Sequence, residues 1–206
     1  MPYKAELTLF IVLAIIATLF FLFLFLYPPI KKSFYKHHTV RAYYKKVARI
    51  AEDNDFYLIN NFKSHTTDSL TFHIDHLLVG DKYIYCIRDR YYDGALSAKE
   101  EDESWIYYQG KNAKYIDNPM RMNELRVEKL ALMSGIKRDI FVSIVLINDD
   151  CWITPLSNTV SRSYLSSLAM LPKIIKTLES DDVPSLDQWA VERVVSDFAT
   201  LKNNEN

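Results

Sequence analysis

A single acid, Asp75, lies within the apolar stretch from Ile74 to Gly80, and it is the residue best placed for chemistry. A carboxylate in such a run is costly to bury unless a metal, a proton or a cationic partner compensates its charge. The stretch has the alternation of a strand, so His73 and Asp75 face one side and His76 faces the other. Because the three side chains cannot converge from a regular strand, we expect no metal site there.

Two arginines end the next predicted strand and could bind phosphate. Arg88 and Arg90 share one face of that strand, and Tyr91 and Tyr92 follow them. Arginine holds phosphate through a planar fork of donors, and nucleic-acid bases stack on tyrosine rings. This pattern is compatible with a nucleic-acid-binding surface, and the alternative is a solvated strand end with packed tyrosines. The sequence has no glycine-rich phosphate loop, nucleophile elbow or Cys/His pair.

The two cysteines and the overall composition suggest an ordinary globular domain with an anchor. About half of the 206 residues are apolar and a quarter are charged. Cys86 and Cys151 lack metal-ligand spacing and lie in apolar runs, so we expect two buried, reduced thiols in a cytoplasmic domain. A disulfide between them is the alternative.

An uncharged apolar run, Leu7 to Tyr27, is long enough to cross a bilayer as a helix. We expect Pro28 and Pro29 to end it at the interface. Lys4 is the only basic residue before the run, whereas seven basic residues follow it. The positive-inside rule then places the N-terminus outside and residues 31–206 in the cytoplasm of a cell-membrane protein. The basic residues expected to lie on anionic headgroups are Lys31, Lys32, Lys36, Arg41, Lys45 and Lys46.

The charge is divided unevenly along the chain. Residues 31–50 carry seven Lys and Arg and no acid, while the chain after residue 50 carries 17 Lys and Arg against 25 Asp and Glu. The domain as a whole is therefore not a basic nucleic-acid binder. Attraction of nucleic acid to the basic stretch remains a second interpretation of that stretch.

The elements that must position these residues form an α/β domain with one central mixed sheet flanked by helices. We divide the chain into an N-terminal segment over 1–30, a basic juxtamembrane stretch over 31–50, a domain over 39–201 and a tail over 202–206. The polar stretch 63–69 is predicted to be a loop. The predicted elements are a helix over 39–53, strands over 56–62, 70–79 and 83–88, a hairpin over 105–116, a helix from 118 to 135, a strand over 140–147, and helices over 164–178 and 183–201.

Three short motifs together resemble the nuclease-related domain (NERD) family across residues 40–147. They are Ile74-Asp75-His76 with Tyr92-x-Gly94 after it, the Trp105 hairpin, and Asn118-Pro119-x-x-x-Asn123 at a helix start. The resemblance implies a restriction-endonuclease-like fold, and members often carry an N-terminal membrane helix. It also implies Mg²⁺-assisted phosphodiester hydrolysis, in which acids on neighbouring strands hold the metal that activates water.

This sequence keeps only the first acid of the pattern that the resemblance implies. Asp75 is retained, but the second acid falls on Arg88 and the lysine on Arg90. The helical glutamate falls near Tyr44, and the glutamine after Asn-Pro falls on Met122. A permanently charged arginine repels Mg²⁺. Our hypothesis is that Arg88 neutralises Asp75 in a hydrogen-bonded ion pair.

We therefore predict a membrane-anchored nuclease-related domain with a degenerate centre, which binds nucleic acid or a membrane or cytoplasmic protein instead of cutting. Nucleic acid would contact Arg88, Arg90 and the basic residues 31–49. One alternative is an active Mg²⁺-dependent nuclease that uses Asp75 with Asp89 or Asp93. The other is a structural membrane-tethered scaffold. We expect no cofactor unless the nuclease alternative holds, in which case it is Mg²⁺.

Overall fold

The computed structural model describes residues 2–64, 72–154 and 162–203, and it divides into two compact units, Met1–Arg41 and Ala42–Asn206. The first unit is the N-terminal part of one long helix, α1 (Pro2–Asn54), whose last turns belong to the second unit. Its stretch Thr8–Tyr27 is long and apolar enough to cross a membrane, as judged by length and composition. The prediction that Pro28 and Pro29 end this helix is wrong. The two prolines remove two N–H donors, but the turns on either side keep their own hydrogen bonds.

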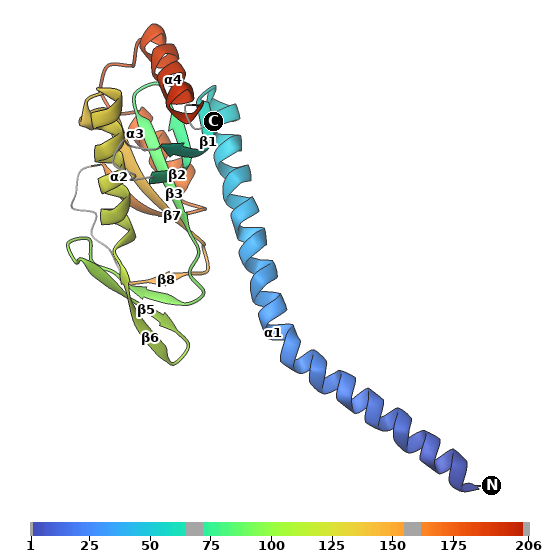
Figure 1. The fold of residues 1–206 in the computed structure, drawn as a ribbon. Coiled ribbons are helices and arrows are strands. Elements are labelled where there is room, and N and C mark those ends of the chain that lie inside the picture. The colour runs from blue at the N-terminus through green and yellow to red at the C-terminus, as the bar shows by residue number, and fades with distance from the viewer. Residues whose placement is uncertain (1, 65–71, 155–161, 204–206) are drawn as a thin grey trace. The chain divides into compact units, whose positions relative to one another are not determined.

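The second unit is built around a five-stranded mixed sheet with the strand order β1-β2-β3-β7-β9. Figure 1 labels β1, β2, β3 and β7 of this sheet. The first three strands form an antiparallel meander, and β7 and β9 add parallel to β3 and to β7. Every residue of β7 is buried, as predicted for a central strand. The strands are β1 (Tyr57–Ser64), β2 (Phe72–Val79), β3 (Ile84–Arg90), β7 (Phe141–Ile147) and β9 (Ser163–Ser167).

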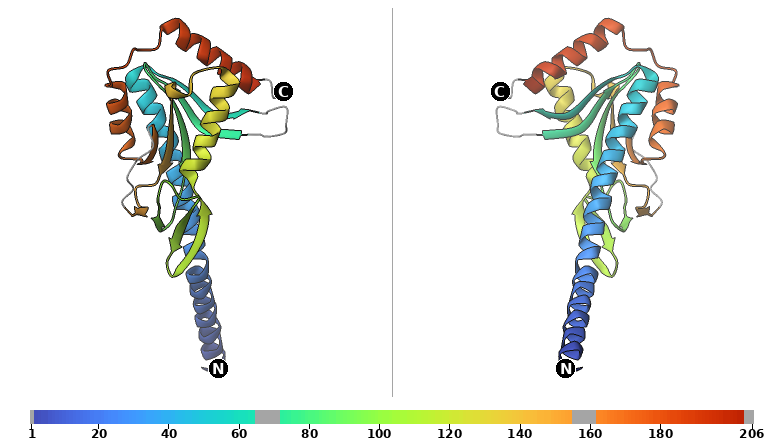
Figure 2. Two further views of the ribbon diagram at one scale, coloured as in Figure 1. Left: turned by 90° about the vertical axis from the view of Figure 1, so that its left-hand side faces the viewer. Right: turned by 90° about the vertical axis from the view of Figure 1, so that its right-hand side faces the viewer.

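Helices cover both faces of this main sheet (Figure 2). On one face, the last turns of α1 and helix α3 (Leu171–Glu179) contribute side chains such as Val47 and Ile175, which pack with Leu78 of β2. On the other face, α2 (Pro119–Ser134) and α4 (Gln188–Asn203) bury Val127 and Phe198 against the strands. Because side chains alternate along a strand, each polar residue of β2 and β3 faces either α1 and α3 or α2 and α4.

A second, four-stranded sheet with the order β6-β5-β4-β8 corrects the prediction of one central sheet. Only the hairpin β5–β6 was predicted, because the other two strands are too short to show a pattern. Gly94 precedes β4 at a φ of 152°, and a Cβ at this position would overlap the carbonyl oxygen of Tyr108. The strands are β4 (Ala95–Ser97), β5 (Ser104–Gln109), β6 (Asn112–Asp117) and β8 (Trp152–Ile153).

The C-terminal third differs most from the prediction. The predicted helix over 164–178 is wrong in its first part, because Ser163–Ser167 pairs with β7 as a strand and the helix begins only at Leu171. The open edge of β7 supplies hydrogen-bond partners that outweigh local helical propensity. The last helix begins at Gln188 instead of 183, beyond Pro184. The predicted loop over 63–69 gives its first two residues to β1, and the rest of it, with 204–206 of the tail, lies outside the described residues.

Candidate functional site

Asp75 and Arg88 face each other across β2 and β3. The antiparallel register places His76 opposite Ile87, and so brings Asp75 beside Arg88. Arg88 Nη1 donates to Asp75 Oδ2 at 2.8 Å, and each side chain is only 16% exposed. The backbone N–H of Asp89 donates to the same oxygen at 2.8 Å. The predicted contact between Arg88 and Asp75 is therefore present, and the carboxylate is held by a cation and by the strand backbone.

His73 is a third side chain that lies against the Asp75–Arg88 pair. Its Nδ1 accepts a hydrogen bond from Arg88 Nη1 at 2.6 Å and lies 3.7 Å from Asp75 Oδ1. Burial lowers the pKa of His73, and the nearby Arg88 lowers it further, while Asp75 partly opposes both effects. An unprotonated Nδ1 is also what a hydrogen bond from a guanidinium requires. His73 therefore acts as a neutral acceptor that fixes Arg88.

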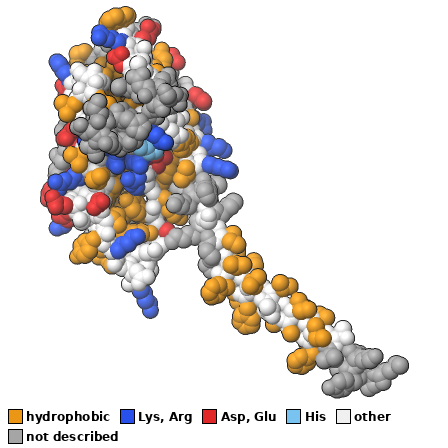
Figure 3. Space-filling model, viewed as in Figure 1, with side chains coloured by type: hydrophobic (Ala, Val, Ile, Leu, Met, Phe, Trp, Pro, Cys, Tyr) orange, Lys and Arg blue, Asp and Glu red, His pale blue; other side chains and the backbone are white. Residues whose placement is uncertain are grey.

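Two further arginines make the site strongly basic. Arg90 lies two residues beyond Arg88 on β3, and Arg126 approaches from α2. Burial lowers the pKa of Arg126, and the charges of Arg88 and Arg90 lower it further. We call Arg88, Arg90 and Arg126 the arginine cluster. Figure 3 shows basic side chains gathered beside a histidine on this face of the molecule. The charges of these three guanidinium groups and of Asp75 act on one another, which leaves an excess of positive charge suited to an anion.

Sequence reasoning missed Arg126, although a signal for it exists. Met122, which takes the place of the expected glutamine, lies one helical turn before Arg126 on α2, and its carbonyl accepts a hydrogen bond from Arg126 Nη1 at 2.9 Å. Residues four apart share a helix face. Had α2 been placed over the strand that carries Arg88, Arg126 would have been recognised as a third cation.

Tyr44 and Asp89, two of the residues that were predicted near Asp75, contact His76 instead of joining the arginine cluster. His76 is fully buried and contacts Asp89 Oδ2 through Nε2 at 3.0 Å and Asn60 Oδ1 through Nδ1 at 2.6 Å. The ring of Tyr44 packs edge-on against His76 with 4.5 Å between centroids. Burial raises the pKa of Asp89, and its bond to His76 partly opposes that rise. Tyr44 and Asp89, both partly buried, thus form a polar cluster with the buried His76.

The donor set does not fit the Mg²⁺ that the family pattern implies. The described residues contain no group of three His, Cys, Asp or Glu side chains arranged to hold a metal ion. Asp89 turns its carboxylate to His76, and Asp93 accepts a hydrogen bond from Gln109 Nε2 at 3.4 Å. Asp89 contacts Asp75 through its backbone N–H, and the Arg88 cation lies against the Asp75 carboxylate. We therefore derive no metal-dependent step for this site.

Tyr92, predicted as part of a surface on which nucleic-acid bases could stack, packs against the second sheet instead. Tyr92 packs its ring on Tyr107 with 5.4 Å between centroids, and its N–H donates to Asn148 Oδ1 at 2.9 Å. Burial raises the pKa of Tyr92 to about 12. Tyr92 therefore belongs to the core of the second sheet.

The Asn-Pro motif positions α2 above the site. Asn118 caps the helix by accepting from the N–H groups of Met120 and Arg121. Asn123 is fully buried, and its Nδ2 donates to the carbonyl of Cys86 at 3.0 Å and to Ser143 Oγ at 2.9 Å. These bonds fix α2 on β3 and β7, and thereby fix Arg126 beside Arg88 and Arg90.

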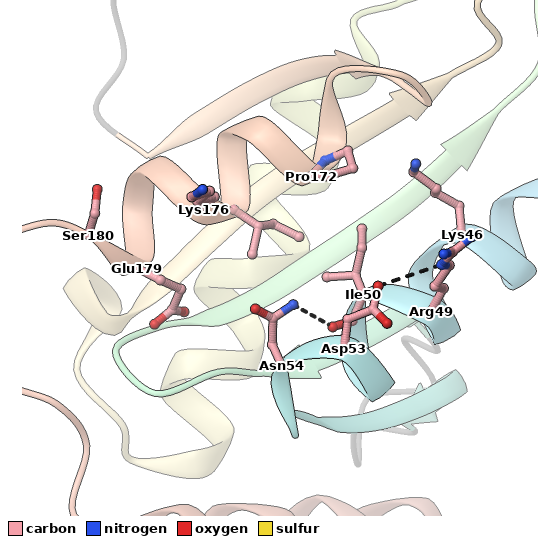
Figure 4. A pocket seen from close by; sticks show the side chains of 10 residues that line it. Lys46, Arg49, Ile50, Asp53, Asn54, Pro172, Lys176, Glu179 and Ser180 are labelled. Carbon is pink, nitrogen blue, oxygen red and sulfur yellow. Dashed lines mark hydrogen bonds and ion pairs between the residues drawn. The ribbon is translucent and has the colours of Figure 1, made fainter.

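A separate pocket of about 620 Å³ lies between the last turns of α1 and α3 (Figure 4). Three basic residues and two acids line it, so its charges largely balance. Arg49 pairs with Asp53 there at 3.6 Å. Of the basic residues predicted to contact headgroups, Lys46 lines this pocket. Arg41 and Lys45 are exposed. The side chains of Lys31, Lys32 and Lys36 lie outside the described part of the chain.

The two cysteines are free and buried. Burial raises the pKa of the Cys151 thiol to about 11, so this group is a poor nucleophile at neutral pH. The expected reduced thiols are present, and the alternative of a disulfide between them is not.

Comparisons with known proteins give one family match. A family model described as the nuclease-related domain (NERD) matches residues 39–148, which is more than half of the chain. No curated protein matches the chain. Among solved structures, a crystal structure of a protein of unknown function, AF1548, is similar with a TM-score of 0.35 and 11% identity, over 76% of this chain and 78% of that chain. The family match includes Asp75 and every residue of the arginine cluster.

Proposed function

Because the chain belongs to the nuclease-related domain family, we propose that it is a membrane-anchored nucleic-acid-binding domain whose nuclease centre no longer cuts. The observation that carries this proposal is the contact of Arg88 with Asp75 at 2.8 Å, with both side chains largely buried. A nuclease of this kind needs a divalent cation beside the acid. Here a guanidinium occupies that place and supplies charge without a water to activate.

The remaining charge supports binding to phosphate. Asp75 can neutralise one guanidinium of the arginine cluster, which leaves Arg90 and Arg126 to contact an anion. An arginine fork matches two oxygens of a phosphate, and partial burial strengthens that contact by lowering the local dielectric. Successive phosphates of DNA or RNA would supply the anion, and a protein partner with acidic side chains is the competing interpretation.

We also propose that the main sheet with α1, α2 and β7 is a degenerate restriction-endonuclease-like core. The meander β1–β3, the helix after it and the parallel strand β7 follow the order that this fold requires. A solved structure of a cleaving family member that superimposes on these elements, with its acids at positions 75 and 88, would support this assignment. A different strand order in such a relative would contradict it.

We propose that the stretch Thr8–Tyr27 of α1, which is long and apolar enough to cross a membrane, is the anchor. We propose that it spans the cell membrane with the N-terminus outside, because basic residues are concentrated after it. The test is labelling of intact expressing cells with a membrane-impermeant maleimide. The variant Lys4→Cys should be labelled and the variant Asn203→Cys should not, and the reverse result would contradict the orientation. The native cysteines are buried and should give little background.

Binding is tested with the full-length chain in detergent micelles and fluorescently labelled single- and double-stranded DNA and RNA. Fluorescence anisotropy over a series of salt concentrations gives the affinity and its salt slope. Arg90→Gln and Arg126→Gln should each weaken binding and reduce the salt slope by about 1, because each removes one phosphate contact. Lys173→Gln, on the exposed face of α3, is the control and should change neither quantity.

A cleavage assay with Mg²⁺ or Mn²⁺ on the same substrates separates the remaining hypotheses. We expect no cleavage. Metal-dependent cleavage that disappears in Asp75→Ala would favour the active-nuclease hypothesis with Asp89 or Asp93 as second ligand. Absence of both cleavage and salt-dependent binding would leave a protein-binding or scaffolding role at the membrane.

A further inference from the structure

The outer face of the second sheet presents three large aromatic side chains to the surroundings. Tyr108 on β5 and Trp152 on β8 both pair with Ala95 on β4, so they lie in one row on the same face. Tyr115 on β6 pairs with Ile106, two residues before Tyr108, and shares that face. These aromatic side chains, which we call the aromatic face, are 40% (Tyr108), 66% (Trp152) and 78% (Tyr115) exposed.

The side chains on the opposite face of the second sheet form its hydrophobic core. Leu96, Trp105 and Tyr107 point inward and form a core with Val145 and Ile147 of the main sheet. The aromatic face is therefore not needed to hold the sheet together. The residues between its aromatic side chains are apolar or small, as at Ala95, Ile106 and Ala113. Its charges lie at its ends, with Lys111 in the hairpin turn and Asp117 at the far end of β6.

The part of α1 that belongs to the domain unit contacts the main sheet at the end of β3. Tyr43, the second residue of the domain unit, donates its hydroxyl to the carbonyl of Arg90 at 2.9 Å. Arg90 ends β3, and the chain then passes directly through Gly94 into β4. The first residues of the domain unit, on α1, therefore lie beside the start of the second sheet.

We propose that the aromatic face docks on the lipid bilayer. Tyrosine and tryptophan combine an apolar ring with a polar tip, and they concentrate at the headgroup level of membranes. This inference rests on the proposed membrane anchor. Residues 28–41, which separate the span from the domain, reach about 21 Å as a helix. A domain of this length has a radius of gyration of about 15 Å, so one of its faces lies within reach of the headgroups.

The chemistry of the face favours a lipid surface over nucleic acid, and a second copy of the chain is the competing occupant. A nucleic acid needs cations along its backbone, and the aromatic face has none between its ends. A second copy of the chain would bury the same rings but would not place them in contact with acyl chains. The test therefore measures contact with lipid directly.

The experiment uses the full-length chain in lipid nanodiscs, one copy per disc, made with phosphatidylcholine that carries bromine on its acyl chains. Bromine quenches tryptophan fluorescence only at short range. The chain has three tryptophans, of which Trp105 is buried, while Trp152 and Trp189 are both 66% exposed. The variant Trp189→Phe retains Trp152, and the variant Trp152→Phe retains Trp189 as a matched control on α4.

We expect brominated lipid to reduce the emission of Trp189→Phe and to leave that of Trp152→Phe unchanged. Equal emission of both variants in brominated and ordinary lipid would overturn the docking proposal while leaving the anchor intact. Shielding of Trp152 from an aqueous quencher without bromine quenching would also overturn it, in favour of another occupant. If the chain fails to enter nanodiscs at all, the anchor fails and the docking proposal fails with it.

Discussion

At the scale of single residues, the ion pair with Arg88 gives Asp75 a structural role. Arg88→Ala removes its cationic partner and leaves a largely buried carboxylate held mainly by a backbone N–H. We expect the free energy of unfolding to fall by roughly 2–4 kcal/mol, somewhat below the loss seen when a fully buried pair is broken. Urea denaturation of the full-length chain in detergent measures this loss.

The matched control for Arg88→Ala is Arg121→Ala. Arg121 pairs with Glu103 at 2.7 Å, but the two side chains are 54% and 81% exposed. An exposed pair contributes roughly 0–1 kcal/mol, so this variant should be close to the wild type. If the two variants lose equal stability, the burial argument for Arg88 is wrong. The double variant Asp75→Asn/Arg88→Gln, which removes both charges, should recover part of the loss.

His73 gives the site a dependence on pH. Its pKa in the folded chain is lowered from the ordinary 6.5 by burial and by Arg88. Between 6.5 and that lower value, the unfolded chain binds a proton that the folded chain does not bind. The free energy of unfolding is therefore highest above pH 6.5 and falls as the pH decreases through this window.

Thermal unfolding of the full-length chain between pH 7.5 and pH 5 measures this effect. In His73→Gln, the amide oxygen can still accept from Arg88 and cannot titrate, so the decrease should become shallower. An unchanged pH profile in this variant would assign the decrease to other groups.

At the scale of elements, the junction between the two sheets depends on a glycine. Gly94→Ala would force a Cβ against the carbonyl oxygen of Tyr108 and displace β4 from β5. Gly110, at a φ of 61° in the hairpin turn, has open space where a Cβ would lie, so Gly110→Ala should cost only about 1 kcal/mol for the left-handed conformation. We expect Gly94→Ala to lose clearly more stability than Gly110→Ala in urea denaturation. Equal losses would mean that β4 can shift without cost.

The elements that the sequence revealed are those with strong local patterns. Asn118-Pro119 and Gly135 bound α2 as predicted, and the apolar β-branched run of β7 identified a buried strand. The short strands β4 and β8 hold two or three residues each, too few for any periodicity. They form because the ends of β3 and β7 deliver them side by side, which is a tertiary effect. The strand β9 was missed for the same reason, since it depends on the edge of β7.

At the scale of the whole molecule, the candidate site was predictable only in part. The contact of Asp75 with Arg88 followed from two adjacent strands and from the cost of burying a lone carboxylate. Arg126 was not found, because it reaches the site only when α2 lies across β3. The placement of Tyr44 next to His76 likewise depends on which face of the sheet α1 covers. The local sequence pattern thus identified the site residues on the strands. The site residues on the helices are recognised only once the packing of the helices on the sheet is known.

The pairing of β7 affects how the chain folds during synthesis and where it can be truncated. The meander β1–β3 can form as soon as it emerges, but β3 gains its parallel partner only after some fifty further residues, which slows folding. The family match stops at residue 148, just after β7, although β9 covers the other edge of that strand. A fragment cut at this boundary would expose the edge of a strand that is otherwise fully buried, and it would be prone to self-association. Expression of the domain therefore needs the chain through β9 and α3, beyond the boundary that the family match alone would give.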